Sequence, residues 1–483
     1  LHAAGLRVGM DVVYNHTTAS RQNARSVLDR IVPGYYHRLN AAGGVEMSTC
    51  CDNTATEHLM MGKLMSDSVL QWATQYRMDS FRFDLMGHQP RAVMVALKAR
   101  LASQTGREVP LVGEGWNFGE VANGARFEQA SQLSLNGSAI GTFSDRARDH
   151  VRGGGPFDGG ADLVKNQGYI SGLFYDDNGS GAGKTRTQLM WSGDIIKAGL
   201  AGSIRDFSFT THWDEVKTLE ALDYNGQPAG YVTAPQEVVN YVENHDNQTL
   251  FDINAYKLPA ATSREDRTRV QMLAAAINAF SQGIGYYHAG IDTLRSKSMD
   301  RNSYNSGDWF NRLDWSYTDN FFATGLPMQG DNGDNWSVMR PILANAAIKP
   351  GGAEIALARD MFRDLLKIRA GTTLLRLRSA ADIRSRLRFH NTGSAQVETV
   401  LVGQVDGNAY PGANFKELVY LINVDKTARD VTVAALAGKS YVLHPVLASA
   451  TAADRRAAND ARYDNSTGRF TVPARTAVVY VAN

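Results

Sequence analysis

Residues 80–86, Ser-Phe-Arg-Phe-Asp-Leu-Met, alternate apolar and polar side chains. This period of two is typical of a β-strand, and it places Arg82 and Asp84 together on the polar face. A predicted helix that begins at the capping-box pattern of residues 54–57 leads into the strand. A second predicted helix follows it at about residues 91–103, and a later one, at about residues 264–280, is preceded by the capping-box pattern Thr262-x-x-Glu265. Because helix and strand alternate around this stretch, we predict parallel strands joined by helices.

The same order of elements recurs along the chain. Four further strands are predicted at residues 7–14, 109–116, 238–242 and 283–287. Ionisable side chains gather where these strands end, among them His16, Glu114 and His245. Reactive groups at the C-terminal ends of several strands are typical of a (β/α)8 TIM barrel rather than of an open sheet with one crevice. We therefore expect an α/β fold of the barrel type.

The pattern changes at about residue 375, where short alternating runs separated by Gly, Asn and Asp replace the helices. Such runs, the last of them at residues 469–481, predict an antiparallel β-sandwich. We therefore expect two domains. The first, at residues 1–373, is a (β/α)8 barrel with a loop excursion at residues 17–53, and the second, at residues 374–483, is an all-β sandwich.

Composition limits the classes of partner. The 50 Lys and Arg residues nearly balance the 49 Asp and Glu residues, and no run of basic residues occurs, so we expect neither nucleic acid nor an anionic membrane as partner. No stretch approaches 18 consecutive apolar residues, so no membrane span is predicted. The two cysteines, Cys50 and Cys51, are neighbours and could form a strained disulfide ring or remain two thiols.

Arg82 and Asp84 are the first candidates for chemistry. A guanidinium one pleat away holds a carboxylate in its ionised form, and a fixed, ionised carboxylate can act as a nucleophile. The alternative is a buried ion pair whose two members only satisfy each other.

Glu114 follows an apolar run, and Trp116 lies on the same face of the predicted strand. Desolvation by the indole and repulsion by a second carboxylate would both raise the pKa of Glu114, which would suit a general acid. The alternative is a strand-end glutamate that caps a helix or faces water.

His16, His245 and Asp246 complete the candidate set at strand ends. Metal ligation is a competing interpretation, because imidazole and carboxylate also bind zinc and iron, but no metal-site spacing accompanies these residues. Three acids and two imidazoles without phosphate-binding glycines favour glycoside hydrolysis by a carboxylate pair.

Four segments in the order expected, at residues 11–17, 81–88, 113–116 and 242–249, resemble conserved regions one to four of the α-amylase clan. Three further segments, at residues 48–58, 141–149 and 294–312, resemble type I pullulanases and plant limit dextrinases. The resemblance covers essentially the whole chain. It implies a hydrolase that cuts α-1,6 linkages in pullulan and in dextrins derived from starch or glycogen, with α-glucans as partners.

The resemblance also implies a role for each site residue. Asp84 would be the nucleophile of a retaining mechanism, Glu114 the general acid and then base, and Asp246 the third carboxylate, which fixes sugar hydroxyls. The residues implied to line the site of the attacked glucose are His16, Arg82 and His245. The further binding residues implied are Tyr14, Trp116, Asn247, Asp308, Trp309 and Arg312.

Other implications concern cofactors, compartment and chain length. The chemistry requires no cofactor, although calcium binds in the clan near an asparagine that resembles Asn15, which allows a structural Ca²⁺. The family implies an extracellular or cell-envelope location. Its members carry N-terminal domains and two barrel strands before the strand that matches residues 7–14, so we expect the isolated 483-residue chain to be unstable or inactive.

Two alternatives remain open. An α-1,4-acting amylase or neopullulanase of the same clan would share all four conserved regions, because linkage choice depends on the shape of the binding site. A non-hydrolytic carbohydrate-binding protein would share the fold, although a complete set of acids disfavours that interpretation.

Overall fold

The computed structural model describes residues 1–180 and 183–483. The chain forms two compact units. The first contains residues 1–143 and 231–239, and the second contains residues 144–230 and 240–483. No helix in the described parts of the chain has the length and apolar character that crossing a membrane requires.

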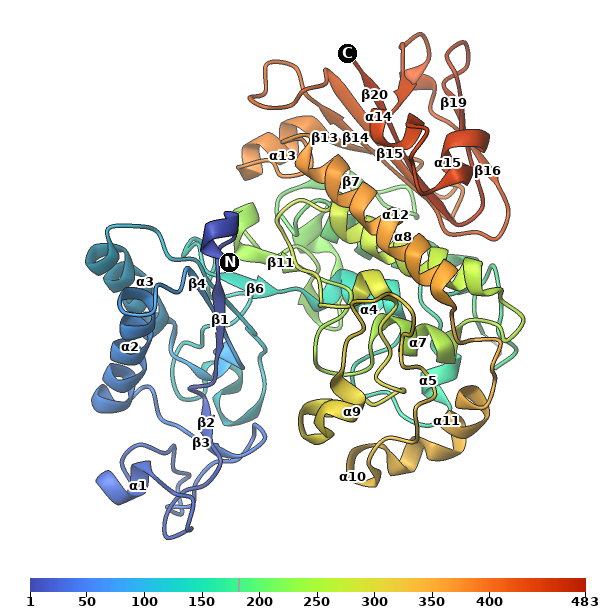
Figure 1. Cartoon of the computed structure of the whole chain (residues 1–483). Coiled ribbons are helices and arrows are strands. Elements are labelled where there is room, and N and C mark those ends of the chain that lie inside the picture. The colour runs from blue at the N-terminus through green and yellow to red at the C-terminus, as the bar shows by residue number, and fades with distance from the viewer. Residues whose placement is uncertain (181–182) are drawn as a thin grey trace. The chain divides into compact units, whose positions relative to one another are not determined.

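The first unit is built on parallel strands, which pair in the order β1-β4-β5-β6-β11 (Figure 1). Their bounds are β1 (Gly9–Val12), β4 (Ser80–Phe83), β5 (Leu111–Gly113), β6 (Gly141–Phe143) and β11 (Val238–Asn240), the last residue of which belongs to the second unit. Asp11 lies opposite Arg82, and Phe83 lies opposite Gly113. The C-terminal ends of β1, β4 and β5 therefore meet at one edge of the sheet.

Two helices, α2 (Leu59–Thr74) and α3 (Arg91–Thr105), lie side by side in this unit (Figure 1). The remaining elements of residues 17–53 are short: helix α1 (Leu28–Ile31) and the paired strands β2 (His16–Thr17) and β3 (Asp52–Asn53). Phe81 and Phe83 are fully buried in a core with Met65, Val69, Leu97 and Leu101. Burial of each phenylalanine ring stabilises the unit by roughly 2–3 kcal/mol.

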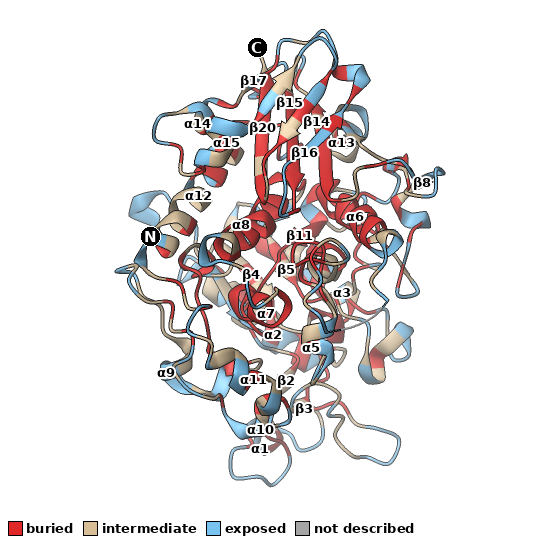
Figure 2. Ribbon diagram, turned by 90° about the vertical axis from the view of Figure 1, so that its right-hand side faces the viewer, coloured by how far each residue is buried: buried red, intermediate tan, exposed pale blue. Residues whose placement is uncertain are grey.

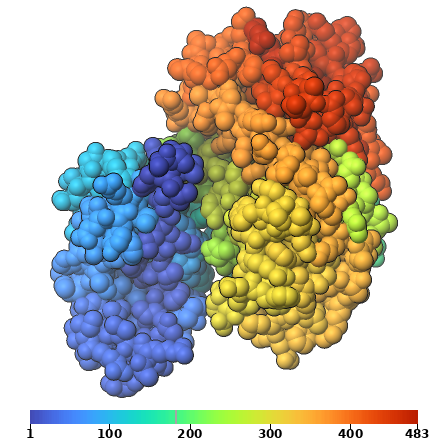
Figure 3. Space-filling model, viewed as in Figure 1, coloured from blue at the N-terminus to red at the C-terminus, as the bar shows by residue number. Residues whose placement is uncertain are grey.

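The N-terminal residues lie on the surface of the first unit, where Figure 3 shows them in dark blue. Leu1 and Leu6 are exposed, and the short 3-10 helix at His2–Ala4 ends at Gly5, whose φ of 74° is left-handed. A glycine therefore ends this short helical turn.

The expected capping boxes are wrong for two helices. Thr54 donates its hydroxyl to the carbonyl oxygen of Tyr14, and Glu57 forms an ion pair with Arg38, so α2 begins at Leu59 without a side-chain cap. Helix α8 (Arg264–Phe280) is capped by Ser263, which accepts from the backbone N–H of Asp266 at 3.1 Å. Thr54 and Glu57 therefore bond to distant segments instead of capping α2. The cap of α8 lies one residue later than the pattern indicates.

The longer elements of the second unit up to residue 386 are helices. Their bounds are α4 (Asp145–Arg152), α5 (Asp162–Lys165), α6 (Arg186–Leu200), α7 (Leu250–Lys257), α8, α9 (Gly307–Asn311), α10 (Gln329–Asn332), α11 (Trp336–Leu343), α12 (Gly352–Ala370) and α13 (Ala380–Arg386). Two short hairpins pair β7 (Ser208–Thr210) with β8 (Val216–Thr218) and β9 (Asp223–Tyr224) with β10 (Gln227–Pro228). Helix α8 packs along α12, and α8 is buried on nearly all sides (Figure 2). Strand β12 (Ile284–Gly285) precedes Tyr286, whose N–H donates to Asn240.

The C-terminal part of this unit contains two antiparallel sheets. The first has the order β13-β14-β15-β20-β17, with bounds Leu387–His390, Val400–Asp406, Glu417–Asn423, Thr476–Ala482 and Val442–Leu443. The second has the order β16-β19-β18, with bounds Arg429–Thr432, Arg469–Val472 and Arg462–Asp464. Two short helices, α14 (Pro445–Ala448) and α15 (Arg455–Asp460), accompany them.

Both C-terminal sheets contribute to one apolar core, which contains Val402 and Leu421 of the first sheet and Val431 and Phe470 of the second. Strands β14, β15 and β20 of the first sheet are buried along most of their length (Figure 2). The expected antiparallel architecture is confirmed. The parallel sheet confirms the α/β part of the expectation, whereas closure into a (β/α)8 barrel and a domain boundary near residue 373 stay predictions.

Candidate active site

The parallel pairing of β1, β4 and β5 brings three predicted site segments to one edge of the sheet. Asp84 follows the last residue of β4, Glu114 follows the last residue of β5, and His16 lies four residues beyond β1. Because parallel strands point the same way, groups far apart in sequence become neighbours. The candidate site in the first unit therefore rests on strand ends.

Arg82 connects three carboxylates. Its Nη1 lies 2.9 Å from Asp11 Oδ1 and 3.1 Å from Asp84 Oδ1, and its Nη2 lies 2.9 Å from Glu114 Oε1. Burial lowers the pKa of Arg82, but the charges of Glu114, Asp11 and Asp84 raise it further, so the net shift is upward. The guanidinium therefore stays charged and contacts both predicted catalytic acids.

Asp84 is fixed from two sides. Asn15 Nδ2 donates to Asp84 Oδ2 at 2.8 Å and to the Asp84 carbonyl oxygen at 2.9 Å, while Arg82 donates to Oδ1. The next residue, Leu85, has a φ of 40°, a left-handed conformation that is strained for a side chain with a Cβ. The Asp84 side chain remains 21% exposed, so a fixed carboxylate keeps access to a ligand.

Glu114 is buried and held by two donors. Its Oε2 accepts from the Leu85 N–H at 2.9 Å, and its Oε1 faces Arg82. The turn after Asp84 packs closely on the backbone of Trp116, because a Cβ at Gly87 would lie 2.1 Å from the Trp116 carbonyl oxygen. The sequence argument considered desolvation and like charge at Glu114. The contact with Arg82 adds an opposite charge that the sequence argument did not consider.

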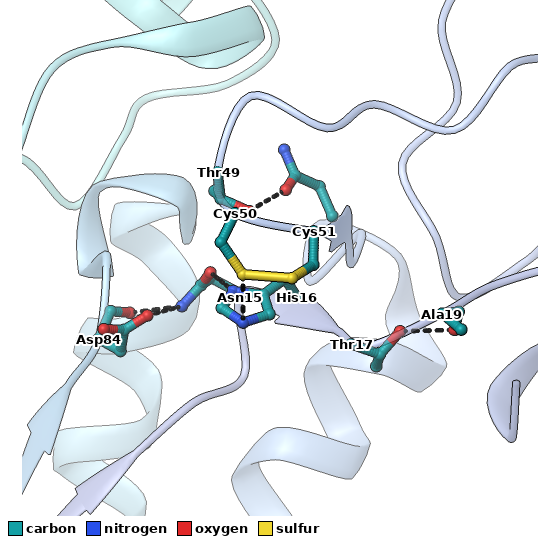
Figure 4. The surroundings of a disulfide bond; sticks show 9 residues. Asn15, His16, Thr17, Ala19, Thr49, Cys50, Cys51 and Asp84 are labelled. Atoms are coloured by element: carbon teal, nitrogen blue, oxygen red, sulfur yellow. Dashed lines mark hydrogen bonds between the residues drawn. A yellow bond between two sulfur atoms is a disulfide. The ribbon is translucent and has the colours of Figure 1, made fainter. Parts of the chain in front are cut away.

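His16 is placed by Asn15 and by a disulfide. Its Nδ1 lies 2.5 Å from Asn15 Oδ1, and its Nε2 lies 3.4 Å from Cys50 Sγ (Figure 4). Burial lowers the pKa of His16, and the charge of Asp84 opposes that shift. The structure joins Cys50 to Cys51 in a disulfide, which decides between the two states that the sequence left open.

Two binding predictions in the first unit have different environments. The Tyr14 hydroxyl lies 2.7 Å from Ser68 Oγ of α2, and burial raises the pKa of Tyr14. Its ring packs on the core beside Phe83. Trp116 is partly buried after β5. The Tyr14 hydroxyl is therefore engaged within the unit, while contact of either ring with a ligand stays a prediction.

The sequence argument missed a second buried arginine, Arg38. It donates to both carboxylate oxygens of Glu57 at 2.9 Å and to Glu120 Oε1 at 2.7 Å. Glu120 also accepts from Asn53 Nδ2 at 3.0 Å and from the Ser48 hydroxyl. Burial raises the pKa of Glu120, but hydrogen bonds from Ser48, Arg38 and Asn53 lower it to about 2.

This network fixes the segment that carries the disulfide. Asn53, at one end of that segment, pairs with His16 in the β2–β3 ladder, and Glu120 lies in the segment after β5 that begins with Glu114. Nothing in the sequence spacing indicates these contacts. Asp11 and Asn15 were also missed as partners of Arg82 and Asp84, although the alternation at residues 7–14 could have indicated Asp11, which lies opposite Arg82.

The second unit holds the other predicted site residues. His245 and Asp246 are exposed on the turn after β11, with His245 Nε2 3.5 Å from Asp246 Oδ1. Lys297 Nζ donates to the His245 carbonyl oxygen at 2.8 Å, and burial lowers the pKa of Lys297 to about 8. Asn247 has a left-handed φ of 61° and donates to the Pro156 carbonyl oxygen at 3.3 Å. Hydrogen bonds from Lys297 and Asn247 thus hold the turn that exposes the His245 imidazole and the Asp246 carboxylate.

The segment of helix α9 presents the remaining three. The guanidinium of Arg312 lies 4.1 Å from the ring centres of both Trp309 and Phe321. Trp309 is exposed, and its Nε1 donates to the Thr324 carbonyl oxygen at 3.2 Å. Asp308 is exposed beside it. An exposed indole held by a cation offers a flat apolar face of the kind that binds a sugar ring.

Among the described residues near Asn15, few oxygen atoms are placed to bind a calcium ion. The side-chain amide of Asn15 is engaged by Asp84 and His16, so its oxygen does not face an open site. Among the His, Cys, Asp and Glu side chains that the structure describes, His16, Cys50 and Cys51 form the group whose ligand atoms lie within 4.8 Å of one another. Calcium prefers oxygen ligands, so this group does not fit it, and a structural calcium ion stays a prediction.

Comparison with known proteins gives consistent matches. Residues 317–483 match the family described as alpha-1,6-glucosidases, pullulanase-type, C-terminal. The chain is 43% identical to Pullulanase 1, chloroplastic, of Arabidopsis thaliana, over 100% of this chain and 51% of that protein. It is 40% identical to pullulanase of Klebsiella pneumoniae, over 98% of this chain and 43% of that protein.

A solved structure matches as well. The crystal structure of Klebsiella pneumoniae pullulanase complexed with maltotriose has a TM-score of 0.92 and 38% identity, over 99% of this chain and 45% of that chain. The present chain therefore spans about half the length of the relatives it matches.

Proposed function

This chain is a relative of the pullulanases along its whole length, and from that premise we propose that it acts as an α-1,6-glucan debranching hydrolase. Residues 317–483 match the C-terminal family of pullulanase-type α-1,6-glucosidases. The observation that carries the proposal is the contact of Arg82 with both Asp84 and Glu114 at adjacent strand ends. We further propose that the parallel strands belong to a (β/α)8 barrel, which the strand order and the position of the acids support.

Asp84 is the proposed nucleophile. Arg82 and Asn15 each hold one of its oxygens, so the carboxylate is fixed and balanced by a positive charge. Attack of an oxygen on the anomeric carbon would form a glycosyl ester and displace the leaving sugar. Asp84 and Glu114 bind one guanidinium, which keeps the two carboxyl groups close. This closeness supports direct attack by Asp84 and retention of anomeric configuration, because an inverting mechanism needs room for a water molecule between the carboxyl groups and the sugar.

Glu114 is the proposed acid and base. It would donate a proton to the glycosidic oxygen as the bond breaks, and it would then remove a proton from the water that hydrolyses the ester. Ester formation removes the negative charge of Asp84, so Glu114 meets less repulsion in its ionised form during the second step. Its fixed position between Leu85 and Arg82 supports both roles.

Binding roles for the other residues complete the proposal. His16, Arg82 and His245 would contact the attacked glucose, and Asp246 would fix its hydroxyls. The exposed Trp309, with Arg312 behind it, would stack on a neighbouring sugar. Pullulan and starch- or glycogen-derived dextrins are the proposed substrates, which the maltotriose complex of the Klebsiella pneumoniae relative supports.

Product analysis after incubation with pullulan tests the proposal. In a protein of the relatives' full length that contains this chain, we expect release of maltotriose, and at least about a 10³-fold lower rate from its Asp84→Asn variant. The matched control is Asp67→Asn, a partly exposed aspartate on α2 that pairs with Lys63 and Arg100. Panose would instead indicate α-1,4 cleavage. Binding of pullulan with no released sugar would replace the proposal by a binding function.

A further inference from the structure

The Cys50–Cys51 disulfide lies directly against His16 (Figure 4). Cys50 Sγ is 3.4 Å from His16 Nε2, and the ligand atoms of all three residues lie within 4.8 Å of one another. Cys50 is exposed, so a reductant can reach the disulfide. The whole chain contains two cysteines, so this disulfide accounts for every thiol the chain could offer.

Hydrogen bonds around Asn15 fix the proton on His16. The Asn15 NH₂ group faces Asp84, because only a donor can pair with a carboxylate and a carbonyl oxygen. Asn15 Oδ1 therefore faces His16 Nδ1 and can only accept. A neutral His16 ring must carry its proton on Nδ1, which leaves a lone pair on Nε2. That lone pair points at a disulfide sulfur, which has no proton to give.

We propose that reduction of the Cys50–Cys51 disulfide creates a site for a soft divalent cation such as Zn²⁺, with both Sγ atoms and His16 Nε2 as ligands. Thiolate and imidazole are preferred zinc ligands, at about 2.3 Å and 2.0–2.1 Å. Tetrahedral geometry at those lengths places sulfur and nitrogen about 3.6 Å apart, close to the 3.4 Å between Cys50 Sγ and His16 Nε2. Only the two sulfurs have to separate, and the fourth position is left for water.

The steps balance with an external dithiol as reductant. The dithiol gives two electrons and two protons to the Sγ–Sγ bond, which becomes two thiols, and the dithiol becomes its own disulfide. Binding of Zn²⁺ then displaces both thiol protons to solvent, because the thiolate is the ligand. The Nδ1–H contact with Asn15 orients the imidazole, as is common for metal-bound histidines.

The consequence for hydrolysis rests on the proposed function, whereas binding of the metal does not. His16 is proposed to contact the attacked glucose, and it is linked through Asn15 to Asp84. A cation on Nε2 would occupy that face of the site. The reduced, metal-loaded chain should therefore hydrolyse pullulan more slowly, and a chelator should restore the rate.

The test is a Cd²⁺ titration of the 483-residue chain, oxidised and reduced, after removal of the reductant under argon. We expect one Cd²⁺ per reduced chain with a thiolate-to-cadmium absorption band, and neither in the oxidised chain. Because the chain has two cysteines, the band reports on this site alone. It should vanish in the Cys50→Ser/Cys51→Ser variant, and His16→Gln should weaken binding at least about tenfold.

The matched control is His58→Gln, a histidine of the same unit whose Nδ1 faces the Tyr35 carbonyl oxygen. It should bind Cd²⁺ as the parent chain does, with circular dichroism confirming that each variant is folded. Absence of the band in the reduced chain, or equal affinity in His16→Gln, overturns the proposal. If the band and its dependence on His16 appear while hydrolysis of pullulan is unchanged, the metal site stands and the proposed role of His16 in hydrolysis fails.

Discussion

Two arginines of the first unit, Arg82 and Arg38, each bind several carboxylates, and they differ in what they leave open. The partners of Arg82 include Asp84, two residues away, whose side chain is 21% exposed. The partners of Arg38 are Glu57 and Glu120, 19 and 82 residues away, and the Arg38 side chain is 2% exposed. Arg82 thus holds acids of which one, Asp84, stays accessible to a ligand, whereas buried Arg38 links the loops that carry Glu57 and Glu120. The same type of contact, an arginine that binds several carboxylates, is proposed to support chemistry at Arg82 and holds loops in position at Arg38.

Replacement of Arg82 should have the largest effect on hydrolysis. In Arg82→Met, the acids Asp11, Asp84 and Glu114 lose their shared cation, so we expect kcat/KM on pullulan to fall about 10²- to 10³-fold. The control is Asp11→Asn, whose half-exposed carboxylate contacts Arg82 from the outer side and should cost less than tenfold. Equal losses in the two variants would show that Arg82 acts through Asp11 and not through the predicted catalytic pair.

Replacement of Arg38 should have the largest effect on folding. Arg38→Met leaves Glu57 and Glu120 without their cation, and the free energy of unfolding should fall by about 3 kcal/mol. Denaturant unfolding at constant m-value measures this loss. The control is Arg100→Met on α3, a partly exposed partner of Asp67, for which the loss should stay below about 1 kcal/mol. Similar losses for both variants would contradict a structural role for the Arg38 network.

The Arg38 network also predicts a pH dependence through His88. Its side chain is fully buried beside Phe118, and burial lowers its pKa to about 4, although Glu120 opposes the shift. Between about pH 6.5 and pH 4 the unfolded chain binds a proton that the folded chain does not, so stability falls as the pH falls through this range. The difference should reach up to about 3 kcal/mol.

The His88→Gln variant tests this pH dependence, because it removes the titrating group. Its thermal midpoint should change less between pH 7 and pH 4.5 than that of the parent chain, and His58→Gln serves as a matched substitution at another histidine of the unit. Parallel pH curves for the parent chain and His88→Gln would contradict the assignment.

The two arginines also show what sequence reasoning can reach. The alternation at residues 80–86 reports the local geometry of one strand, so it gave the pairing of Arg82 with Asp84 and the burial of both phenylalanines. No local period connects Arg38 to Glu120, because that contact depends on how distant loops fold. The disulfide state was equally open. The predicted run at residues 469–481 is split by Pro473 into strands of different sheets, since proline lacks the N–H that a continuous strand needs.

The N-terminal cap of helix α8 also differs between the sequence pattern and the structure, and its replacement should have the smallest of the predicted effects. The capping-box pattern indicates Thr262, whereas the structure uses Ser263, whose Oγ accepts from the Asp266 N–H at 3.1 Å. Ser263→Ala should lower the free energy of unfolding by about 1 kcal/mol, because an N–H at the start of the helix loses its acceptor. Thr262→Ala should change it by less than about 0.5 kcal/mol, and the reverse order would restore the cap that the sequence pattern predicts.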